Sequence, residues 1–581
     1  MTLLQHLESR LSKALETVLG ESTTPNLTTA ADLRFGDYQS NSAMVLAKRM
    51  KTNPRALAER IIESIEINDL ATAKIDGPGF INFTVLPAAY ANYAETLLKD
   101  PKLGTPELGK GKRIVIDFSA PNVAKPMHVG HIRSTIIGDS LCRIARFLGF
   151  EVIADNHIGD WGTQFGMILH GWKSRLDAEA LEQDPIRELV RIYREVNSAT
   201  KENPAILESC KAELVRLQAG DPENLAIWQQ CIDVSKAGLQ NIYDQLDVKF
   251  DHWLGESFYN EMLPALVEEF VKKGLARESD GAICIFSDKS KDPSQDPFKV
   301  HREDGWTDNP AIIRKADGGF LYATTDLATI QYRIDTWNAD QIWYVVGAPQ
   351  QLHFRQIFEA AHRWGKTGDF RHIAFGSILG EDRKLMKTRS GDNVGLTDVL
   401  EEAIQRAANV ISEKNPELQG KEAEKIAEIV GIGAVKFAEL SQNRLTDYVF
   451  AWDRMLALQG DTAPYLQYSN VRIRSIFRKL DGEFDAGSAR IHLERPEEIH
   501  LARLLARFGE ILPMVIEDFR PNLLANYLLE LARAFHSFFE ACPVLKSEEP
   551  HKTSRLALCH LCSRTLEQGL GLLGIKCPER M

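Results

Sequence analysis

The chain has 581 residues, of which 44% are hydrophobic and 26% are charged, and its formal net charge is −12. This length exceeds what one hydrophobic core usually supports, so we expect about two to four domains. The composition is that of a globular protein, and it contains no apolar stretch long enough to cross a bilayer. Charged side chains interrupt the first residues, Met1 to Arg10, where a signal peptide needs an apolar core, so we expect a cytoplasmic location.

The eight cysteines are scattered along the chain, which predicts reduced thiols rather than a disulfide framework. Only Cys559 and Cys562 have a spacing typical of a metal site. They lie in an apolar helical pattern without a second pair nearby, so buried thiols are favoured and we predict no structural metal. The negative net charge counts mildly against binding to RNA, because phosphate binding depends on Lys and Arg, although a local basic face can coexist with it.

At the start of the chain, a helical stripe of leucines runs from Leu3 to Val18, and residues 43–67 contain two more helical patterns separated near Pro54. A strand-like segment, Gly79 to Val85, follows them. Residues 1–98 are therefore predicted to form a small α/β domain. The next residues, 99–112, are rich in Pro, Gly and Lys and are typical of a linker, so we expect the second domain to begin near Gly111.

The segment Arg113 to Phe118 is short, apolar and β-branched, which is typical of a buried parallel strand. A loop leads from it to His128-Val129-Gly130-His131. A helical pattern then continues to Leu148, and Gly149 is placed to end it. A second strand, Glu151 to Ala154, completes a βαβ unit.

The N-terminus of this helix favours an anion, because its backbone N–H groups are unpaired and carry a partial positive charge. Gly130 lets a phosphate or a flat base approach the backbone, and His128 and His131 can donate hydrogen bonds to oxygens that gain charge during a reaction. These features predict a nucleotide-phosphate site. The alternative is a pair of helix-capping histidines that bind no ligand.

Residues 172–278 contain mostly helical patterns, and they separate the first βαβ unit from strand-like segments at 341–346 and 372–378. The alternation of strands and helices on both sides predicts one α/β domain, residues 111–400. We expect a doubly wound parallel sheet, Rossmann-like and of the HUP type, interrupted by a helical insertion at about 172–278. Its site should lie at the carboxyl edge of the strands.

Residues 401–460 are predicted to be connecting helices, and residues 461–581 an all-α domain. Strand signals disappear from Pro496 onward. Long amphipathic patterns occupy 496–519, 522–541 and 553–574, which predicts a helix bundle.

Two long segments resemble one family. Ser119 to Thr135 (SAPNVAKPMHVGHIRST) and Gly159 to Gly166 (GDWGTQFG) are similar to the class I aminoacyl-tRNA synthetases, whose HIGH motif occupies positions 128–131, and among them to the arginyl-tRNA synthetases. The likeness extends from Gly36-Asp37-Tyr38 to the end of the chain, Pro578 to Met581.

This resemblance implies an ATP-dependent ligase of protein biosynthesis. Arginine and ATP would form arginyl-adenylate and pyrophosphate, and the arginyl group would then pass to the 3′ end of tRNA(Arg). The resemblance also implies that tRNA must be bound even for the first step, and that the protein is a monomer.

By the same resemblance, Lys384 to Asp392 is a degenerate form of the family's KMSKS loop. Its lysines can neutralise the pyrophosphate that leaves, and Lys125 can share this task. Mg²⁺ is expected to travel with ATP, with no tightly bound cofactor. The predicted catalytic residues are His128, His131, Lys125 and Lys387. The predicted ATP-binding residues are His128, Gly130, His131, His353, Lys384 and Lys387. A solvated basic loop and a core histidine at position 353 are the alternatives.

A planar guanidinium is bound best by carboxylates, with a hydroxyl or amide completing the set. The resemblance implies that Asp117, Tyr322 and Asp326 face the guanidinium of arginine, with Asn122 and Gln350 nearer to its α-amino and carboxylate groups. A helix would place Tyr322 and Asp326 on one face, as ordinary surface patterning also would.

For tRNA, the start of the C-terminal domain sets aromatic residues beside arginines, so bases can stack on the rings while arginines bind phosphates. It resembles the family's anticodon-binding domain. The predicted tRNA-binding residues are Tyr465, Tyr468, Arg472 and Met581. The alternative is a charged helix face over a tyrosine-capped core. Gly36 to Asn41 is similar to part of the family's domain for the tRNA elbow.

Two other functions stay open at this point. One is a different class I synthetase, or a nucleotidyltransferase that adenylates a small acid without RNA; the helical C-terminal domain counts against the RNA-free version. The other is a catalytically silent RNA-binding relative, and the presence of His128, His131 and Lys387 counts against it.

Overall fold

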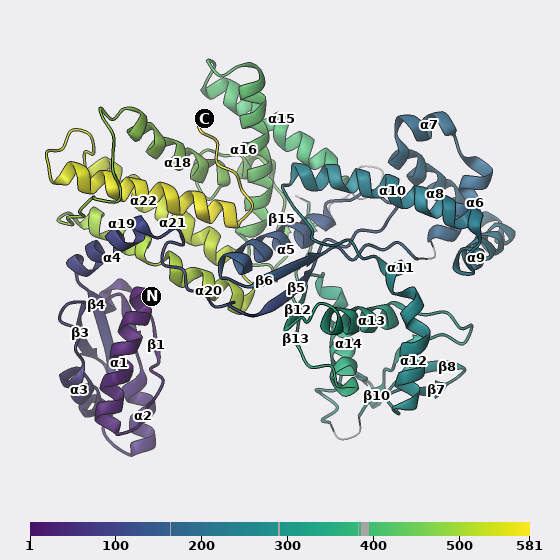
Figure 1. Cartoon of the computed structure of the whole chain (residues 1–581), viewed down its shortest axis with the longest axis horizontal. Helices are drawn as coiled ribbons and strands as arrows, with labels where there is room; N and C mark the ends of the chain where they lie inside the picture. The colour runs from purple at the N-terminus through teal and green to yellow at the C-terminus, as the bar shows by residue number, and fades with distance from the viewer. Residues whose placement is uncertain (163, 289–290, 381–382, 385–393) are drawn as a thin grey trace. The chain divides into compact units, whose positions relative to one another are not determined.

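A computed structural model of the chain describes residues 1–162, 164–288, 291–380, 383–384 and 394–581. The chain forms two compact units (Figure 1). One unit contains residues 1–108 and 457–581, and the other contains residues 109–456. Within the described ranges, no helix combines the length and the apolarity needed to cross a membrane.

The centre of the second unit is a four-stranded parallel sheet with the strand order β13-β12-β5-β6. Its strands are β5 (Arg113–Asp117), β6 (Glu151–Asp155), β12 (Gln341–Tyr344) and β13 (Asp369–His372). The register places Asp117 between Tyr344 and Asp155 at the carboxyl ends. Ile114, Val115 and Ile116 are fully buried, as expected for a parallel strand covered on both faces.

Helix α5 (Gly130–Phe147) connects β5 to β6 and confirms the predicted βαβ unit. Its apolar positions are buried, including Ile132, Ile136 and Leu141. The helix lies very close to the end of β5, because a Cβ added at Gly138 would come within 2.2 Å of the Phe118 side chain. A glycine is needed here for space and not for its backbone freedom.

The helical insertion is confirmed, and it begins earlier than predicted. Its helices are α6 (Gln164–Arg175), α7 (Ala178–Gln183), α8 (Pro185–Glu202), α9 (Pro204–Gln218) and α10 (Pro222–Gln245). Phe165, Leu169, Leu189 and Leu217 are buried in a hydrophobic cluster that also contains Val123 and Ala124 of the loop after β5. Figure 1 shows α10 as a long helix that runs from this insertion back toward α5.

A small β region follows the insertion, which sequence patterns did not predict. The elements are α11 (Glu256–Tyr259), η2 (Asn260–Met262), α12 (Leu263–Lys272), β7 (Arg277–Ser279), β8 (Ala282–Ile285), β9 (Lys299–Arg302), β10 (Gly305–Asp308) and β11 (Ala311–Arg314). The strands of this region form the antiparallel sheets β11-β8-β7 and β10-β9. Strands of three or four residues are too short to show a clear period.

The rest of the second unit returns to the parallel sheet and then leaves it. Its elements are α13 (Tyr322–Asp335), η3 (Ala348–Gln350), α14 (Gln351–Trp364), β14 (Ile378–Leu379), α15 (Leu396–Lys414), α16 (Gly420–Leu440), β15 (Tyr448–Val449) and α17 (Trp452–Met455). The predicted single strand at 372–378 is wrong. β13 ends at His372, and β14 begins at Ile378 and pairs with β15.

The N-terminal domain of the first unit is the predicted small α/β domain. Its elements are α1 (Leu3–Leu19), β1 (Leu27–Thr29), η1 (Leu33–Phe35), β2 (Tyr38–Ser40), α2 (Ser42–Met50), α3 (Pro54–Ser64), β3 (Ala71–Asp76), β4 (Phe80–Val85) and α4 (Pro87–Lys99). Its antiparallel sheet has the order β1-β2-β4-β3, and only β4 was predicted from the sequence.

The C-terminal domain of the first unit is the predicted helix bundle. Its helices are α18 (Ala463–Arg478), α19 (Pro496–Ala506), α20 (Phe508–Asp518), α21 (Asn522–Ala541) and α22 (His551–Leu572). No strand occurs in residues 457–581, all of which are described. The predicted single helix at 496–519 is two helices that meet at Arg507, because the amphipathic spacing continues through the break.

Candidate active site

The loop between β5 and α5 has an unusual backbone. Ser119, Ala120 and Ala124 have φ values of 73°, 45° and 59°, which lie in a left-handed region that residues other than glycine rarely adopt. Such strain persists only where the surroundings impose it, and it is concentrated at functional sites. The carboxyl end of β5 is therefore a built site rather than a plain connection.

Side chains from distant elements hold this loop. The Ser119 N–H donates to Ser134 Oγ at 2.8 Å, and the Ala124 N–H donates to Ser235 Oγ of α10 at 3.0 Å. The hydroxyl of Tyr243, also on α10, is 2.7 Å from Ser119 Oγ. The helical insertion thus supports the loop through α10.

Hydrogen bonds with the backbone hold the rings of the two signature histidines. The Gly130 N–H donates to His128 Nδ1 at 3.1 Å, and the His128 N–H donates to His131 Nδ1 at 3.1 Å. A backbone N–H can only donate, so the Nδ1 of His128 accepts and its ring proton is on Nε2. The Nδ1 of His131 also lies 3.3 Å from the His128 carbonyl, so it accepts from the His128 N–H in one tautomer and donates to that carbonyl in the other. Gly130 permits this arrangement, because a Cβ there would lie 2.9 Å from the His128 ring.

Both histidines are neutral near pH 7. Burial lowers the pKa of His128, and burial together with the neighbouring His128 lowers the pKa of His131 to about 4. The ring centroids are 4.1 Å apart. The start of α5 therefore carries two neutral imidazoles, and the Nε2–H of His128 can stabilise a phosphate oxygen without adding a charge of its own.

The segment that follows the lysine loop is bonded to the signature. The Val129 N–H donates to the Val394 carbonyl and the Leu396 N–H donates to the Met127 carbonyl, both at 2.9 Å. On the other side, the Gly380 N–H donates to the Lys384 carbonyl at 2.8 Å, and Lys384 is exposed. Lys387 lies outside the described residues.

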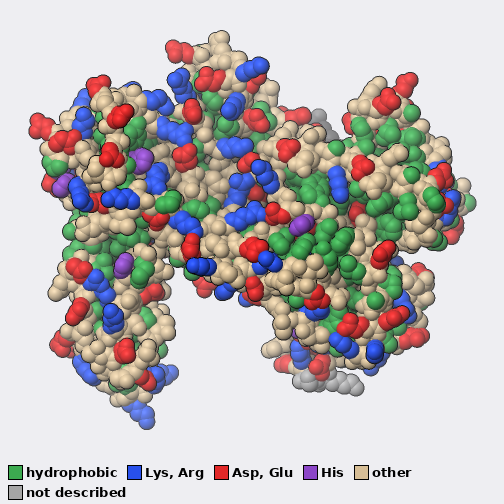
Figure 2. All heavy atoms as spheres, viewed as in Figure 1, with side chains coloured by type: hydrophobic (Ala, Val, Ile, Leu, Met, Phe, Trp, Pro, Cys, Tyr) green, Lys and Arg blue, Asp and Glu red, His purple; other side chains and the backbone are tan. Residues whose placement is uncertain are grey.

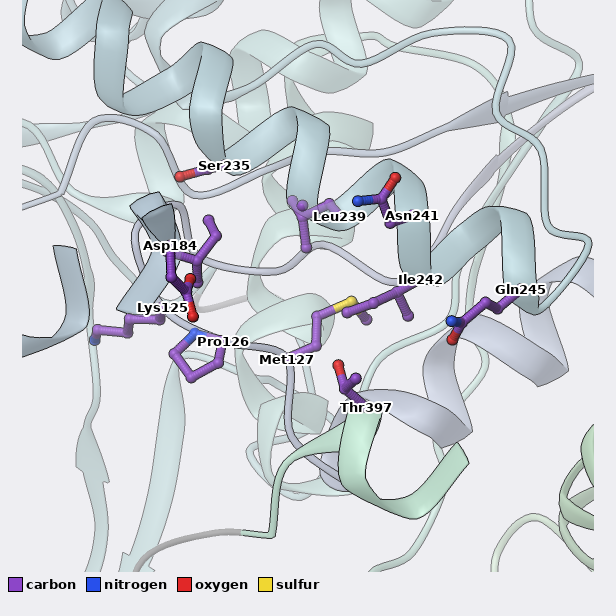
Figure 3. Close-up of a pocket in the computed structure, with 12 residues that line it drawn as sticks. Lys125, Pro126, Met127, Asp184, Ser235, Leu239, Asn241, Ile242, Gln245 and Thr397 are labelled. Carbon is purple, nitrogen blue, oxygen red and sulfur yellow. The ribbon is translucent and has the colours of Figure 1, made fainter. Parts of the chain in front are cut away.

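Lys125 lies beside the helical insertion. Its Nζ is 4.9 Å from the centroid of the Tyr193 ring of α8. Lys125 also lines a cavity of about 420 Å³, together with residues of α10, Met127 and Thr397 at the start of α15 (Figure 3). Its predicted contact with phosphate stays a prediction.

Asp117 has a partner within the chain. Arg333 of α13 is fully buried and donates through Nη2 to Asp117 Oδ2 and Asp155 Oδ2, both at 2.7 Å. Its guanidinium lies 5.3 Å from the centroid of the Tyr344 ring. Burial raises the pKa of Asp117, against the opposing effect of Arg333. Asp117 therefore anchors α13 to the strand ends, and its predicted contact with a guanidinium stays a prediction.

The structure places Tyr322 and Asp326 together on α13. Tyr322 is 65% exposed, and the Asp326 side chain is 17% exposed. His353 Nε2, at the start of α14, lies 2.5 Å from Asp326 Oδ2. The sequence interpretation put His353 beside ATP, whereas its observed partner is a carboxylate of the amino-acid set.

Glu256 of α11 is a further acid that sequence reasoning missed. Burial raises its pKa to about 7, with His157 opposing the shift and Asp160 and Asp326 adding to it. Burial raises the pKa of Tyr322, and the charge of Glu256 raises it further. Glu256 comes from the segment after the insertion, and no local pattern in the sequence marks it as part of this group.

Asn122 and Gln350 are both exposed. Asn122 pairs with Gly159, and a Cβ at Gly159 would lie 2.5 Å from Asn122 Oδ1, so the glycine of the GDWG segment leaves room for this amide. Gln350 ends η3, next to the start of α14. Their predicted contacts with the α-amino and carboxylate groups are not tested by these positions.

The four predicted tRNA-binding residues lie in the C-terminal domain. Tyr465, Tyr468 and Arg472 are on α18, and Tyr468 is 45% exposed. Arg472 lies 4.4 Å from the centroid of the Phe539 ring and 3.1 Å from His536 Nδ1. The tail that ends in Met581 runs along α18, where Arg478 donates to the Glu579 carbonyl.

The segment Gly36 to Asn41 contains β2 and is bonded to the helix bundle. Tyr38 donates its hydroxyl hydrogen to Glu510 of α20 at 2.8 Å, and both side chains are buried. On the visible face of the N-terminal domain, basic and acidic side chains are interspersed (Figure 2). Cys559 and Cys562 are buried in α22, and burial raises the pKa of both thiols.

Comparison with known families gives three matches along the chain. Residues 93–452 match the family described as "tRNA synthetases class I (R), catalytic domain". Residues 466–581 match the "DALR anticodon binding domain", and residues 4–85 match the "Arginyl tRNA synthetase N terminal domain".

Similar proteins and structures cover the whole chain. The arginine–tRNA ligase of Laribacter hongkongensis is 43% identical, and that of Pseudomonas entomophila is 44% identical, each over 100% of both chains. The crystal structure of arginyl-tRNA synthetase from Plasmodium falciparum has a TM-score of 0.83 and 28% identity, covering 100% of this chain and 99% of that one. The Thermus thermophilus arginyl-tRNA synthetase has a TM-score of 0.81 and 25% identity, covering 100% of both chains.

Replacing Arg333 with Met should destabilise the second unit. The substitution leaves the carboxylates of Asp117 and Asp155 buried without a cation, which costs about 3–5 kcal/mol. The measurement is urea unfolding followed by circular dichroism at pH 7. Adding Asp117→Asn and Asp155→Asn to the same variant should recover part of the loss, and a loss below about 1 kcal/mol for Arg333→Met alone would contradict this role.

Proposed function

This chain belongs to the arginyl-tRNA synthetase family, class I enzymes that charge tRNA with arginine, and we propose that the strained β5–α5 loop and the start of α5 bind its ATP. The observation that carries the proposal is the pair of neutral imidazoles at the N-terminus of α5, in a segment whose Val129 N–H and Met127 carbonyl are bonded to Val394 and Leu396. The helix terminus supplies further N–H groups and a partial positive charge to the same phosphates.

The first reaction needs positioning and charge neutralisation, and no protein nucleophile. An oxygen of the arginine carboxylate attacks the α-phosphorus of ATP in line, the bond to the β-phosphate oxygen breaks, and pyrophosphate leaves with the electron pair. His128 and His131 hold phosphate oxygens as their charge grows, and Lys384 and Lys387 neutralise the leaving pyrophosphate. Mg²⁺ accompanies ATP as part of the substrate. A hydroxyl of the tRNA 3′ end then attacks the arginyl carbonyl and AMP leaves.

The arginine pocket is formed around the start of α13. Asp326 and Tyr322 bind the guanidinium, and Glu256 adds a second carboxyl group beside them. Asp117 acts mainly through Arg333, which fixes α13 on the sheet. The exposed amides of Asn122 and Gln350 bind the α-amino and carboxylate groups.

For tRNA, residues 461–581 serve as the anticodon-binding domain, with Tyr465, Tyr468, Arg472 and Met581 at the contact surface. Arg472 is already held over an aromatic ring, so little side-chain freedom is lost when RNA binds. Residues 1–98 contact the tRNA elbow through the segment around β2. We place the enzyme in the cytoplasm as a monomer.

The central test is aminoacylation of bulk tRNA with each proteinogenic amino acid in turn. Charging with arginine alone is expected. His128→Ala and His131→Ala should each lower arginine-dependent pyrophosphate exchange by about 10²–10³-fold. His301→Ala, on the exposed strand β9, is the matched control and should leave exchange unchanged. Absence of charging with arginine would reject the function, and full exchange without tRNA would reject the tRNA dependence of the first step.

The lysines should act on the leaving pyrophosphate. Lys384→Ala and Lys387→Ala should each lower the kcat of pyrophosphate exchange by about tenfold or more, with little effect on the KM for arginine. Removing Lys125 together with Lys387 should cost more than either change alone. Lys211→Ala, on the exposed face of α9, is the control. An unchanged exchange rate in Lys125→Ala would contradict a role of Lys125 toward the pyrophosphate and leave only its contact with the Tyr193 ring.

The KM for arginine should fall as pH rises from 6 to 8. Burial lowers the pKa of His353, but its hydrogen bond and charge interaction with Asp326 outweigh burial and raise it. Deprotonation of His353 frees Asp326 for the guanidinium, and Glu256, with a pKa of about 7, gains its charge over the same range. The guanidinium of arginine stays charged throughout.

Two variants separate these contributions. We expect about a three- to tenfold change in KM for the wild type, a smaller change in Glu256→Gln, and a smaller change in His353→Asn. Steady-state pyrophosphate exchange at pH 6, 7 and 8 measures it. A KM for arginine that does not vary with pH in the wild type would show that neither group titrates beside the substrate.

A further inference from the structure

Arg133 is a buried cation that has no role in the proposed ATP and arginine sites. It lies two residues after His131 on α5 and is 1% exposed. Its Nε donates to Glu439 Oε1 at 2.7 Å, and its Nη1 donates to the Thr446 carbonyl at 3.0 Å. The guanidinium also lies 5.3 Å from the centroid of the Tyr448 ring.

The partner carboxylate is equally enclosed. The Glu439 side chain, on α16, is 0% exposed. Burial raises the pKa of Glu439, against the opposing effects of Arg133 and of a hydrogen bond from Tyr448. Replacing such a buried ion pair by apolar side chains is often neutral or stabilising, so a contribution to stability is not by itself a sufficient reason for this pair.

Through Tyr448 of β15, the ion pair is in contact with the strand pair β14–β15. Tyr448 pairs with Ile378, the Tyr448 N–H donates to the Ser377 carbonyl at 3.2 Å, and the Phe450 N–H donates to the Leu379 carbonyl at 2.9 Å. β14 leads directly to Gly380, whose N–H donates to the Lys384 carbonyl. A short path of backbone bonds therefore connects the partner of Arg133 with Lys384.

The chain after the lysine loop, from Val394 onward, is attached to the start of α5. Val394 and Leu396 are bonded to the backbone of Val129 and Met127 at 2.9 Å. The start of α5 thus holds the downstream flank through its backbone, and Arg133 holds the upstream flank through its side chain. Both attachments lie within a few residues of His128 and His131.

We propose that Arg133, Glu439 and Tyr448 are positioning residues for adenylate formation, which fix β14–β15 on the signature helix and thereby set the place of Lys384 relative to His128 and His131. This role rests on the proposed function of the histidines and of Lys384 in binding the phosphates of ATP. It predicts a defect in the chemical step that involves pyrophosphate, and not in the binding of arginine.

The test compares two substitutions on one helix. Arg133→Lys keeps the positive charge but loses the fork that reaches both Glu439 and Thr446. Arg143→Lys is the matched control, because Arg143 is a partly buried arginine near the other end of α5 whose Nε is 2.7 Å from the buried Asp139. Tyr448→Phe provides a milder change, which removes one hydroxyl and keeps the ring.

The measurements are the kcat of tRNA-dependent pyrophosphate exchange, the KM values for ATP and arginine, and the melting temperature. Arg133→Lys should lower kcat/KM for ATP by about ten- to a hundredfold and leave the KM for arginine within about twofold, because displacement of a positioned group by about 1 Å is enough for such a loss. Tyr448→Phe should show a smaller loss of the same kind. Arg143→Lys should lower the melting temperature without this pattern.

Two outcomes would overturn the proposal. One is an Arg133→Lys enzyme that loses no more kcat/KM for ATP than Arg143→Lys; the other is an equal loss toward arginine and ATP. If Arg133→Lys does not fold, Tyr448→Phe decides by the same criterion. Lys384→Ala separates this result from failure of the proposed function: if that variant keeps full exchange activity, the assignment of Lys384 fails first, whereas a strong loss there with a normal Tyr448→Phe enzyme rejects only the positioning role.

Discussion

One buried guanidinium fixes the carboxyl edge of the parallel sheet, and the proposed chemistry depends on that edge. The register sets Tyr344, Asp117 and Asp155 side by side at the ends of three adjacent strands. Arg333 binds both carboxylates and lies over the tyrosine ring. Because Arg333 belongs to α13, the same cation sets where the phenol and the acid of the proposed arginine pocket stand relative to the strand ends.

The ATP side follows a different principle. The β5–α5 loop holds Ser119, Ala120 and Ala124 in a left-handed backbone, and their N–H groups donate hydrogen bonds to side chains of α5, of the residue after β6 and of α10. At its end, burial keeps His128 and His131 neutral, and backbone N–H groups hold the two rings. A neutral donor stays bonded to an oxygen as negative charge moves from the α-phosphate to pyrophosphate. The positive charge that neutralises the pyrophosphate can then come from the lysines.

Sequence patterns were sufficient where structure is local. The β-branched run and the helical spacing around the signature predicted β5, α5 and β6, and amphipathic spacing predicted the insertion and the bundle. The antiparallel strands β8 and β11 were missed, since a strand of four residues has no measurable period. Side-chain partners were missed for another reason: Arg333 is 216 residues from Asp117 and Glu439 is 306 from Arg133, and no local pattern encodes such a pairing.

Glu256 shows where this difference matters for function. The family resemblance grouped Tyr322 with Asp326, and their four-residue spacing on α13 is consistent with it. The acid that interacts electrostatically with both comes from α11, after the helical insertion. The same holds for His353, which reaches Asp326 from the next helix. A pocket for a guanidinium needs negative charge from several directions, whereas a single helix face supplies it from one, so the pocket must be assembled by the fold. The charge of the proposed pocket then depends on pairings between elements, which is why we expect arginine binding to vary with pH although the guanidinium itself does not titrate.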